Sequence, residues 1–141
     1  MTAAEGATWT IAKIEKSYEA RALLVFLEHV PDRRRAEEAF ARIGRLVRER
    51  KLVELDPTAP GEVHRPLDYA RSPHSLARSL FSDEVISAQL DALVAAQQGD
   101  GGWMFNWKDW NPATTLERRG WLTVETLRIL RAYGRLPGVP V

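Results

Sequence analysis

In the first third of the chain, apolar residues recur every three or four positions, which is the spacing of one helical face. In the first pattern, over residues 9–29, these positions are Ile11, Ile14, Tyr18, Ala22 and Val25. In the second pattern they are Ala36, Phe40, Ile43 and Val47. Pro31 ends the first helix, and Asp32 is a good N-cap for the second. The pattern predicts an antiparallel helical hairpin over residues 1–52.

This periodicity disappears over residues 53–81. Prolines and a glycine punctuate the segment at Pro57, Pro60, Gly61, Pro66 and Pro73. Proline removes a backbone donor and disfavours helix at the residue before it. We therefore expect a long proline-rich loop here. Loops of this length in a compact domain usually wrap a surface or cover a site.

Helical spacing returns after Ser82, which is a good N-cap. The expected buried stripe of this helix is Val85, Ile86, Leu90, Leu93, Val94 and Gln97. Gly99 ends the helix, and a tight turn follows. We then expect a short helix from Pro112 toward Arg119, an interruption at Gly120, and a last helix capped by Thr123.

The last helix has its apolar face at Val124, Leu127, Leu130 and Ala132 or Tyr133, and ends before Gly134. Residues 82–136 thus form a helix-loop-helix unit. Because no segment alternates with period two, the sequence predicts an all-α fold of antiparallel helix hairpins. A length of 141 residues fits a single domain over residues 1–141.

The turn after the third helix carries a recognisable motif. Gln97, Gly101 and Trp103 have the spacing Gln-x-x-x-Gly-x-Trp, with Asp100 and Gly102 between them. This resembles the QW repeat of squalene and oxidosqualene cyclases and of protein prenyltransferase β subunits. Residues 64–136 also resemble the carboxy-terminal part of bacterial prenyltransferase/squalene-oxidase-repeat proteins. The resemblance implies part of an α/α toroid, in which the motif is structural.

The catalytic devices of those enzyme families are missing from this sequence. It has neither the Asp-x-Asp-Asp cluster of the cyclases nor a cysteine for the prenyltransferase zinc site. The three histidines, His29, His64 and His74, lack the short spacing of a zinc site. We therefore assign no catalytic residue, metal or cofactor.

Aromatic residues cluster directly after the motif. Trp103, Trp107, Trp110 and Trp121 are four of the five tryptophans. Exposed indoles bind sugars or apolar ligands, so we nominate Trp107 and Trp110 as ligand-binding candidates. Lys108 and Asp109 lie between them and can bind hydroxyl groups. In the structural alternative, Trp103 and Trp121 belong to the hairpin core, and Trp107 and Trp110 pack the loop against neighbouring helices.

Composition narrows the remaining choices. Hydrophobic residues make up 45% and charged residues 28%, which is typical of a soluble globular protein. The formal net charge is +1, so the protein as a whole has no strong electrostatic attraction to nucleic acid or anionic membranes. No signal peptide and no run of eighteen apolar residues is evident, so we expect a cytoplasmic protein without a membrane partner. The second helix is rich in arginine, at Arg42, Arg45, Arg48 and Arg50 among others. No recognised nucleic-acid-binding motif accompanies this charge, which favours a solvated helix face.

Together these features lead to one main hypothesis about function. A repeat unit of this kind buries its apolar face only against neighbours. We therefore expect a noncatalytic helical repeat module that self-associates, binds a protein partner or completes a larger toroid. One alternative is a terpenoid- or carbohydrate-class enzyme or ligand carrier that uses the tryptophan-rich loop. Another is nucleic-acid binding through the arginine-rich second helix.

Overall fold

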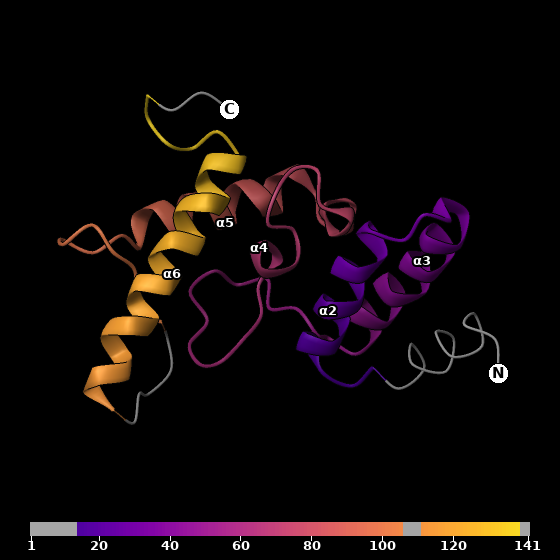
Figure 1. Ribbon diagram of the computed structural model, residues 1–141, viewed down its shortest axis with the longest axis horizontal. Helices are drawn as coiled ribbons and strands as arrows, with labels where there is room; N and C mark the ends of the chain where they lie inside the picture. Colours follow the sequence, from indigo (N-terminus) through magenta and orange to yellow (C-terminus); the bar gives the residue numbers. More distant parts are fainter. Residues whose placement is uncertain (1–13, 106–110, 139–141) are drawn as a thin grey trace.

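The computed structural model describes residues 14–105 and 111–138. Within these ranges the protein is all α, with five α-helices, one 3₁₀ helix and no strand. In chain order they are α2 (Ser17–Glu28), α3 (Arg33–Glu49), α4 (Pro66–Tyr69), the 3₁₀ helix η1 (Leu76–Leu80), α5 (Asp83–Ala95) and α6 (Pro112–Ala132). In Figure 1, the α2–α3 pair lies at one end, α5 and α6 lie at the other, and α4 lies between them.

The α2–α3 pair is the predicted hairpin. The Asp32 side chain accepts a hydrogen bond from the Arg35 backbone N–H at 3.2 Å, so the predicted N-cap is confirmed. The buried residues of α3 are Ala36, Ile43, Gly44 and Val47, and Phe40 is partly buried. This face agrees closely with the predicted one.

The buried face predicted for the first helix is only partly right. Ile14, just before α2, is buried as predicted, and Ile11 lies outside the described residues. Within α2 the predicted face is wrong. Its buried residues are Ala20, Leu24 and Leu27, whereas Tyr18 and Val25 are more than half exposed. Both stripes have helical spacing, so periodicity alone did not distinguish them. The stripe with two leucines packs against α3, and α2 is left with an apolar outer face.

The segment between the two helix pairs is not the continuous loop that the prolines predict. It contains α4 and η1. Pro66 begins α4, a position where proline costs nothing because the first helical N–H groups have no intrahelical partner. The Asp68 carboxylate accepts a hydrogen bond from the Arg65 backbone N–H at 2.7 Å and closes the first turn.

Tyr69, at the end of α4, connects the parts of the fold. Its ring is buried and lies 6.4 Å from the Phe81 ring, centroid to centroid. Its hydroxyl donates to the Leu52 carbonyl, just after α3, at 2.7 Å. The Tyr133 hydroxyl, from the end of α6, donates to the Ala70 carbonyl at the same distance. The short helix α4 therefore holds both helix pairs.

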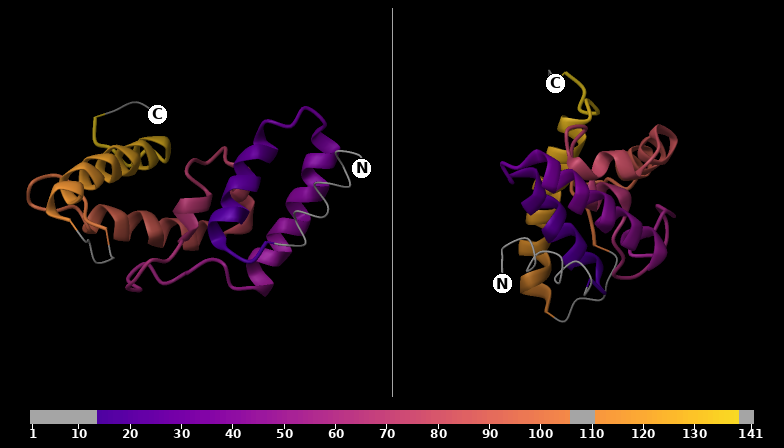
Figure 2. Two further views of the ribbon diagram at one scale, coloured as in Figure 1. Left: turned by 60° about the horizontal axis from the view of Figure 1, so that its bottom comes forward. Right: turned by 90° about the vertical axis from the view of Figure 1, so that its right-hand side faces the viewer.

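The cap of α5 is also confirmed, because the Ser82 side chain accepts from the Val85 N–H at 3.2 Å. The helix ends at Ala95, earlier than the predicted end at Gly99. Figure 2 shows α6 joined to α5 at one end of the molecule and diverging from it.

The last two predicted helices are a single helix, α6. Gly120 stays within it, and the Thr123 hydroxyl donates to the Arg119 carbonyl at 2.7 Å instead of capping a new helix. Asn111 caps α6 by accepting from the Ala113 N–H. The buried residues are Thr126, Ile129 and Leu130, whereas the predicted core residues Val124 and Leu127 are exposed. Of the predicted stripe, Leu130 is in the core and Tyr133 is partly buried against it.

Among the described residues, no helix is both long enough and apolar enough to cross a bilayer.

We predict that Tyr69→Phe destabilises the protein by about 1–3 kcal/mol, because the partly buried Leu52 carbonyl loses its donor. Thermal and urea unfolding followed by circular dichroism measures the change. The matched control is Tyr18→Phe, whose ring is exposed, and we expect it to change stability by less than about 0.5 kcal/mol. Equal stability of the two variants would contradict the central role of Tyr69.

Candidate functional site

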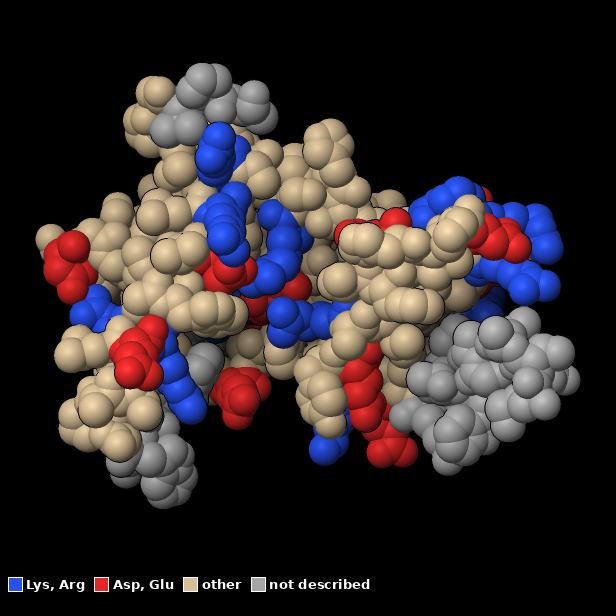
Figure 3. Space-filling view, viewed as in Figure 1, with Lys and Arg blue, Asp and Glu red and all other residues tan. Residues whose placement is uncertain are grey.

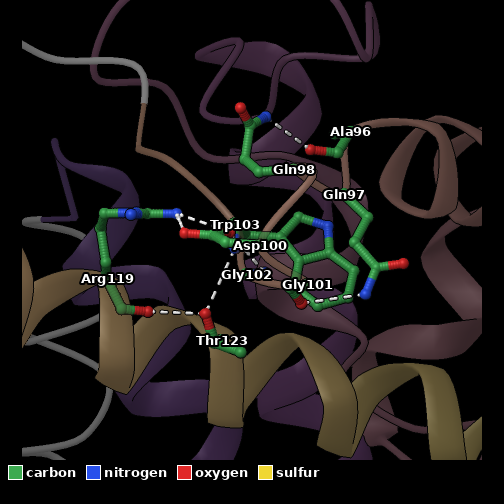
Figure 4. A network of polar contacts seen from close by, with 9 residues as sticks. All are labelled: Ala96, Gln97, Gln98, Asp100, Gly101, Gly102, Trp103, Arg119 and Thr123. Carbon is green, nitrogen blue, oxygen red and sulfur yellow. Dashed lines mark hydrogen bonds and ion pairs between the residues drawn. The ribbon is translucent and has the colours of Figure 1, made fainter.

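The turn after α5 is organised by its own polar groups (Figure 4). The Gln97 Nε2 donates to the Gly101 carbonyl at 2.9 Å, and the Gly102 N–H donates to the Asp100 carboxylate at 3.0 Å. Gln98 exchanges backbone hydrogen bonds with Gly101 and Gly102. Gly101 has a φ of 86°, a conformation that residues with a side chain rarely adopt. These contacts explain why a Gln-x-x-Asp-Gly-Gly sequence forms this turn.

Trp103 anchors the turn between α5 and α6. Its indole is 3% exposed and donates through Nε1 to the Leu93 carbonyl of α5 at 2.8 Å. Its backbone N–H donates to the Thr123 hydroxyl of α6 at 3.2 Å. Asp100 forms an ion pair with Arg119 of α6 at 2.8 Å. The motif residues thus fix the position of α6 relative to α5.

A cleft of about 330 Å³ lies beside this turn. One side is formed by the segment around residues 57–71, and the other by α5, α6 and residues 103–105. Its apolar lining includes Leu67, Leu93, Met104, Trp121, Leu122 and Ile129. In Figure 3, charged side chains of both signs gather between α6 and the α2–α3 pair. The cleft has the size and the mixed lining of a small-molecule site.

His64 lies on the side of the cleft formed by the proline-rich segment. Its Nδ1 is 2.6 Å from the Ser17 hydroxyl at the start of α2. Partial burial lowers the pKa of His64, and the nearby Arg21 guanidinium lowers it further. The imidazole is therefore neutral near pH 7.

Two carboxylates in the cleft are already occupied by structural contacts. Asp68 caps α4 through its contact with the Arg65 N–H. Glu125 is mostly buried and forms ion pairs with Arg71 at 2.7 Å and Arg128 at 2.8 Å. Both carboxylates are therefore committed to contacts within the fold.

Gln89 and Thr126 are the two polar residues among the described ones that are buried outright, with 4% and 3% exposed. Both line the cleft, one from α5 and one from α6. The Gln89 Nε2 donates to the Leu55 carbonyl at 2.7 Å. In the described part of the structure, the Gln89 Oε1 and the Thr126 hydroxyl make no hydrogen bond. Neither is among the fully buried unpaired atoms. Both oxygens therefore keep some access to the cleft, where a bound molecule or water can reach them.

The tryptophans separate into two environments. Trp103 is in the core, whereas Trp121 lies at the edge of the cleft and is exposed, so the prediction that both are core residues is wrong for Trp121. The ligand-binding candidates Trp107, Lys108, Asp109 and Trp110 lie outside the described residues.

Sequence reasoning missed the polar residues of the cleft. Gln89 and Thr126 each interrupt an otherwise apolar helix face, which was the only available signal. His64 and Arg71 come from the segment that was expected to be loop. Within the described ranges, no group of three or more histidine, aspartate or glutamate side chains could hold a metal ion.

The positive charge of the arginines on α3 is partly neutralised by neighbouring acidic groups. Arg34 pairs with Glu38 at 2.6 Å, and Arg35 pairs with Asp32 at 3.5 Å. Figure 3 shows acidic side chains among the basic ones at this end of the molecule. Exposed pairs of this kind are typical of a solvated helix face.

Comparisons with protein-family models, with curated proteins and with solved structures found no match for this chain. The resemblance to cyclase and prenyltransferase repeats therefore stays a prediction from the sequence.

We predict that Asp100 stabilises the fold in a pH-dependent way. Hydrogen bonds from the Gly102 N–H and from Arg119 lower the pKa of Asp100 in the folded protein. Because the pKa is lower in the folded than in the unfolded protein, the charged Asp100 stabilises the fold when the pH is above its unfolded-state pKa of about 4. This stabilisation is lost as the pH falls through the lower pKa of the folded state. Urea unfolding should show Asp100→Asn less stable than the wild type near neutral pH.

The difference between the two proteins should shrink below about pH 4. Glu37→Gln is the control, because Glu37 is exposed on α3 and makes no hydrogen bond or ion pair in the described structure. A stability difference that stays constant down to acidic pH would show that the charge of Asp100 is irrelevant.

Proposed function

We propose that this protein is a noncatalytic helical module whose function is binding, and that the cleft between residues 57–71 and the α5–α6 pair is its binding site. The observation that carries the proposal is the lining of this cleft. Apolar side chains form most of its walls, and Gln89 and Thr126, two largely buried residues, each have an oxygen with unused hydrogen-bonding capacity. Sites for small organic molecules commonly combine these features.

The polar groups narrow the class of ligand. The Gln89 Oε1 is an acceptor, and the Thr126 hydroxyl both donates and accepts. A ligand that satisfies them carries a hydroxyl group on an apolar body. Terpenoid alcohols fit this description better than oligosaccharides, which have few apolar faces.

Binding is favoured over catalysis because the candidate acid–base groups are committed to the fold. Asp68 caps α4, Glu125 holds two arginines, and His64 contacts Ser17. General acid–base catalysis needs a positioned group with a pKa near the operating pH and access to the substrate.

The class of repeat is part of the same proposal. The Gln97–Trp103 turn joins two helices and contributes its tryptophan to the core between them, which is the structural role that the QW resemblance implies. On this basis we assign the chain to the squalene-cyclase/prenyltransferase-like repeat class, as part of an α/α toroid. The proposed location is the cytoplasm, as expected from the sequence.

A second candidate function is association with another protein surface through α6. The outer face of this helix exposes Leu116, Trp121, Val124 and Leu127. A helix that is apolar on opposite sides is usually buried on both. Completion of a larger toroid, a different protein partner, or self-association would each cover this face.

We predict that farnesol, a terpenoid alcohol, binds in the cleft and shifts tryptophan emission to the blue, and that Thr126→Val weakens its binding about fivefold, the effect of losing one hydrogen bond of about 1 kcal/mol. Fluorescence titration measures the affinity, and mass spectrometry should recover the alcohol unchanged.

The control is Ser79→Ala, an exposed hydroxyl outside the cleft, which should bind farnesol like the wild type. Saturable binding of maltotriose in place of farnesol would move the site to the carbohydrate class. Binding of neither probe would refute the cleft as a site for hydroxyl-bearing organic ligands, and chemical conversion of the probe would refute a noncatalytic role.

A further inference from the structure

The outer face of α6 has the arrangement of a helix that packs against another helix. Leu116, Gly120, Val124 and Leu127 follow one another at spacings of four, four and three residues, so they share one face. Leu116 is 70% exposed, and Trp121, beside this face, is 62% exposed. In Figures 1 and 2, α6 lies at the edge of the molecule, and its first turns extend beyond the other described helices. This face is therefore open to a partner.

The same face is complementary to itself. If two copies of α6 cross antiparallel about a two-fold axis near Leu122, Leu116 comes opposite Leu127 of the partner subunit. In the same register, Gly120 comes opposite Val124 of the partner subunit. A Cβ at Gly120 would meet nothing within 4 Å in its own chain, so the partner's valine can approach the backbone closely there.

The charges beside the apolar stripe obey the same symmetry. In this register, Glu117 comes opposite Arg128 of the partner subunit, and each contact occurs twice. Glu117 is exposed and has no hydrogen bond or ion pair in the described structure. Arg128 is 73% exposed, and its single ion pair is with Glu125. A two-fold interface requires that every residue finds its counterpart on the same surface, which apolar and charged positions both do here.

We propose that the outer face of α6 is a homodimer interface in which two copies of the helix pack antiparallel. The inference rests on the second candidate function and names its partner: a second copy of this chain. It does not depend on a ligand in the cleft, since the residues of the stripe lie on the side of α6 away from Thr126 and Ile129.

The first test is the mass of the full chain by light scattering and analytical ultracentrifugation, from about 1 μM to about 1 mM. We expect a monomer–dimer equilibrium within this range. Val124→Glu should weaken the dimer more than about a hundredfold, because it places two like charges at the centre of an apolar interface. Val25→Glu is the matched control, because Val25 is a similarly exposed valine (53% against 49%) on α2, and it should leave the dimer unchanged.

A charge exchange then tests the register. Glu117→Arg and Arg128→Glu should each weaken the dimer about tenfold, because each creates two like-charge contacts. The double variant restores opposite charges and should recover most of the affinity. A mixture of the two single variants should form heterodimers in preference to either homodimer.

Each outcome decides the proposal. A monomer at every concentration overturns it, and a larger toroid or a different partner then covers α6. A dimer that tolerates Val124→Glu uses another face and also overturns it. Circular dichroism of every variant excludes unfolding as the cause. Farnesol titration of Val124→Glu distinguishes a failure of the interface from a failure of the cleft. If only the interface is lost, this variant still binds farnesol in the cleft.

Discussion

The packing of one buried tyrosine holds the two halves of this protein together. Tyr69 is the last residue of a helix of only four residues, yet its hydroxyl bonds the chain after α3 and its ring lies against Phe81, just before α5. Next to it, the Ala70 carbonyl accepts a hydrogen bond from Tyr133 at the end of α6. Burial raises the pKa of Tyr69 to about 12, so these contacts keep their donor throughout the physiological range. The same short segment forms part of one wall of the cleft.

The parts of the fold that the sequence predicted are those with local causes. Asp32 and Ser82 cap helices because a short oxygen-bearing side chain can reach the free N–H groups of the first turn. The faces of α2 and α6 were mispredicted because both helices have two apolar stripes, and the choice between them depends on distant neighbours. Gly120 suggested a break, but its cost within a helix is only about 1 kcal/mol, which the packing of a helix of this length offsets.

The candidate site was also predictable only where its cause is local. The turn from Gln97 to Trp103 is continuous in sequence, so its spacing alone indicates its structural role. The cleft combines His64, Gln89 and Thr126 from three separate elements. No spacing connects them, and a polar residue within an apolar face is equally consistent with a structural contact. Only the arrangement of the elements reveals that Gln89 and Thr126 face one cleft with hydrogen-bonding capacity left over.

One face of α6 lines the cleft, and another carries the exposed apolar stripe. Glu125 lies between these two faces. This carboxylate holds Arg71 of the cleft through one oxygen and Arg128 through the other. If Arg128 turns to Glu117 of a second copy, Glu125 keeps its partner in the cleft. In the Glu125–Arg128 pair the arginine is 73% exposed. An ion pair open to water on one side contributes about 1 kcal/mol, so its loss leaves the cleft almost unchanged. Association and ligand binding are therefore expected to be nearly independent, although both depend on the same helix.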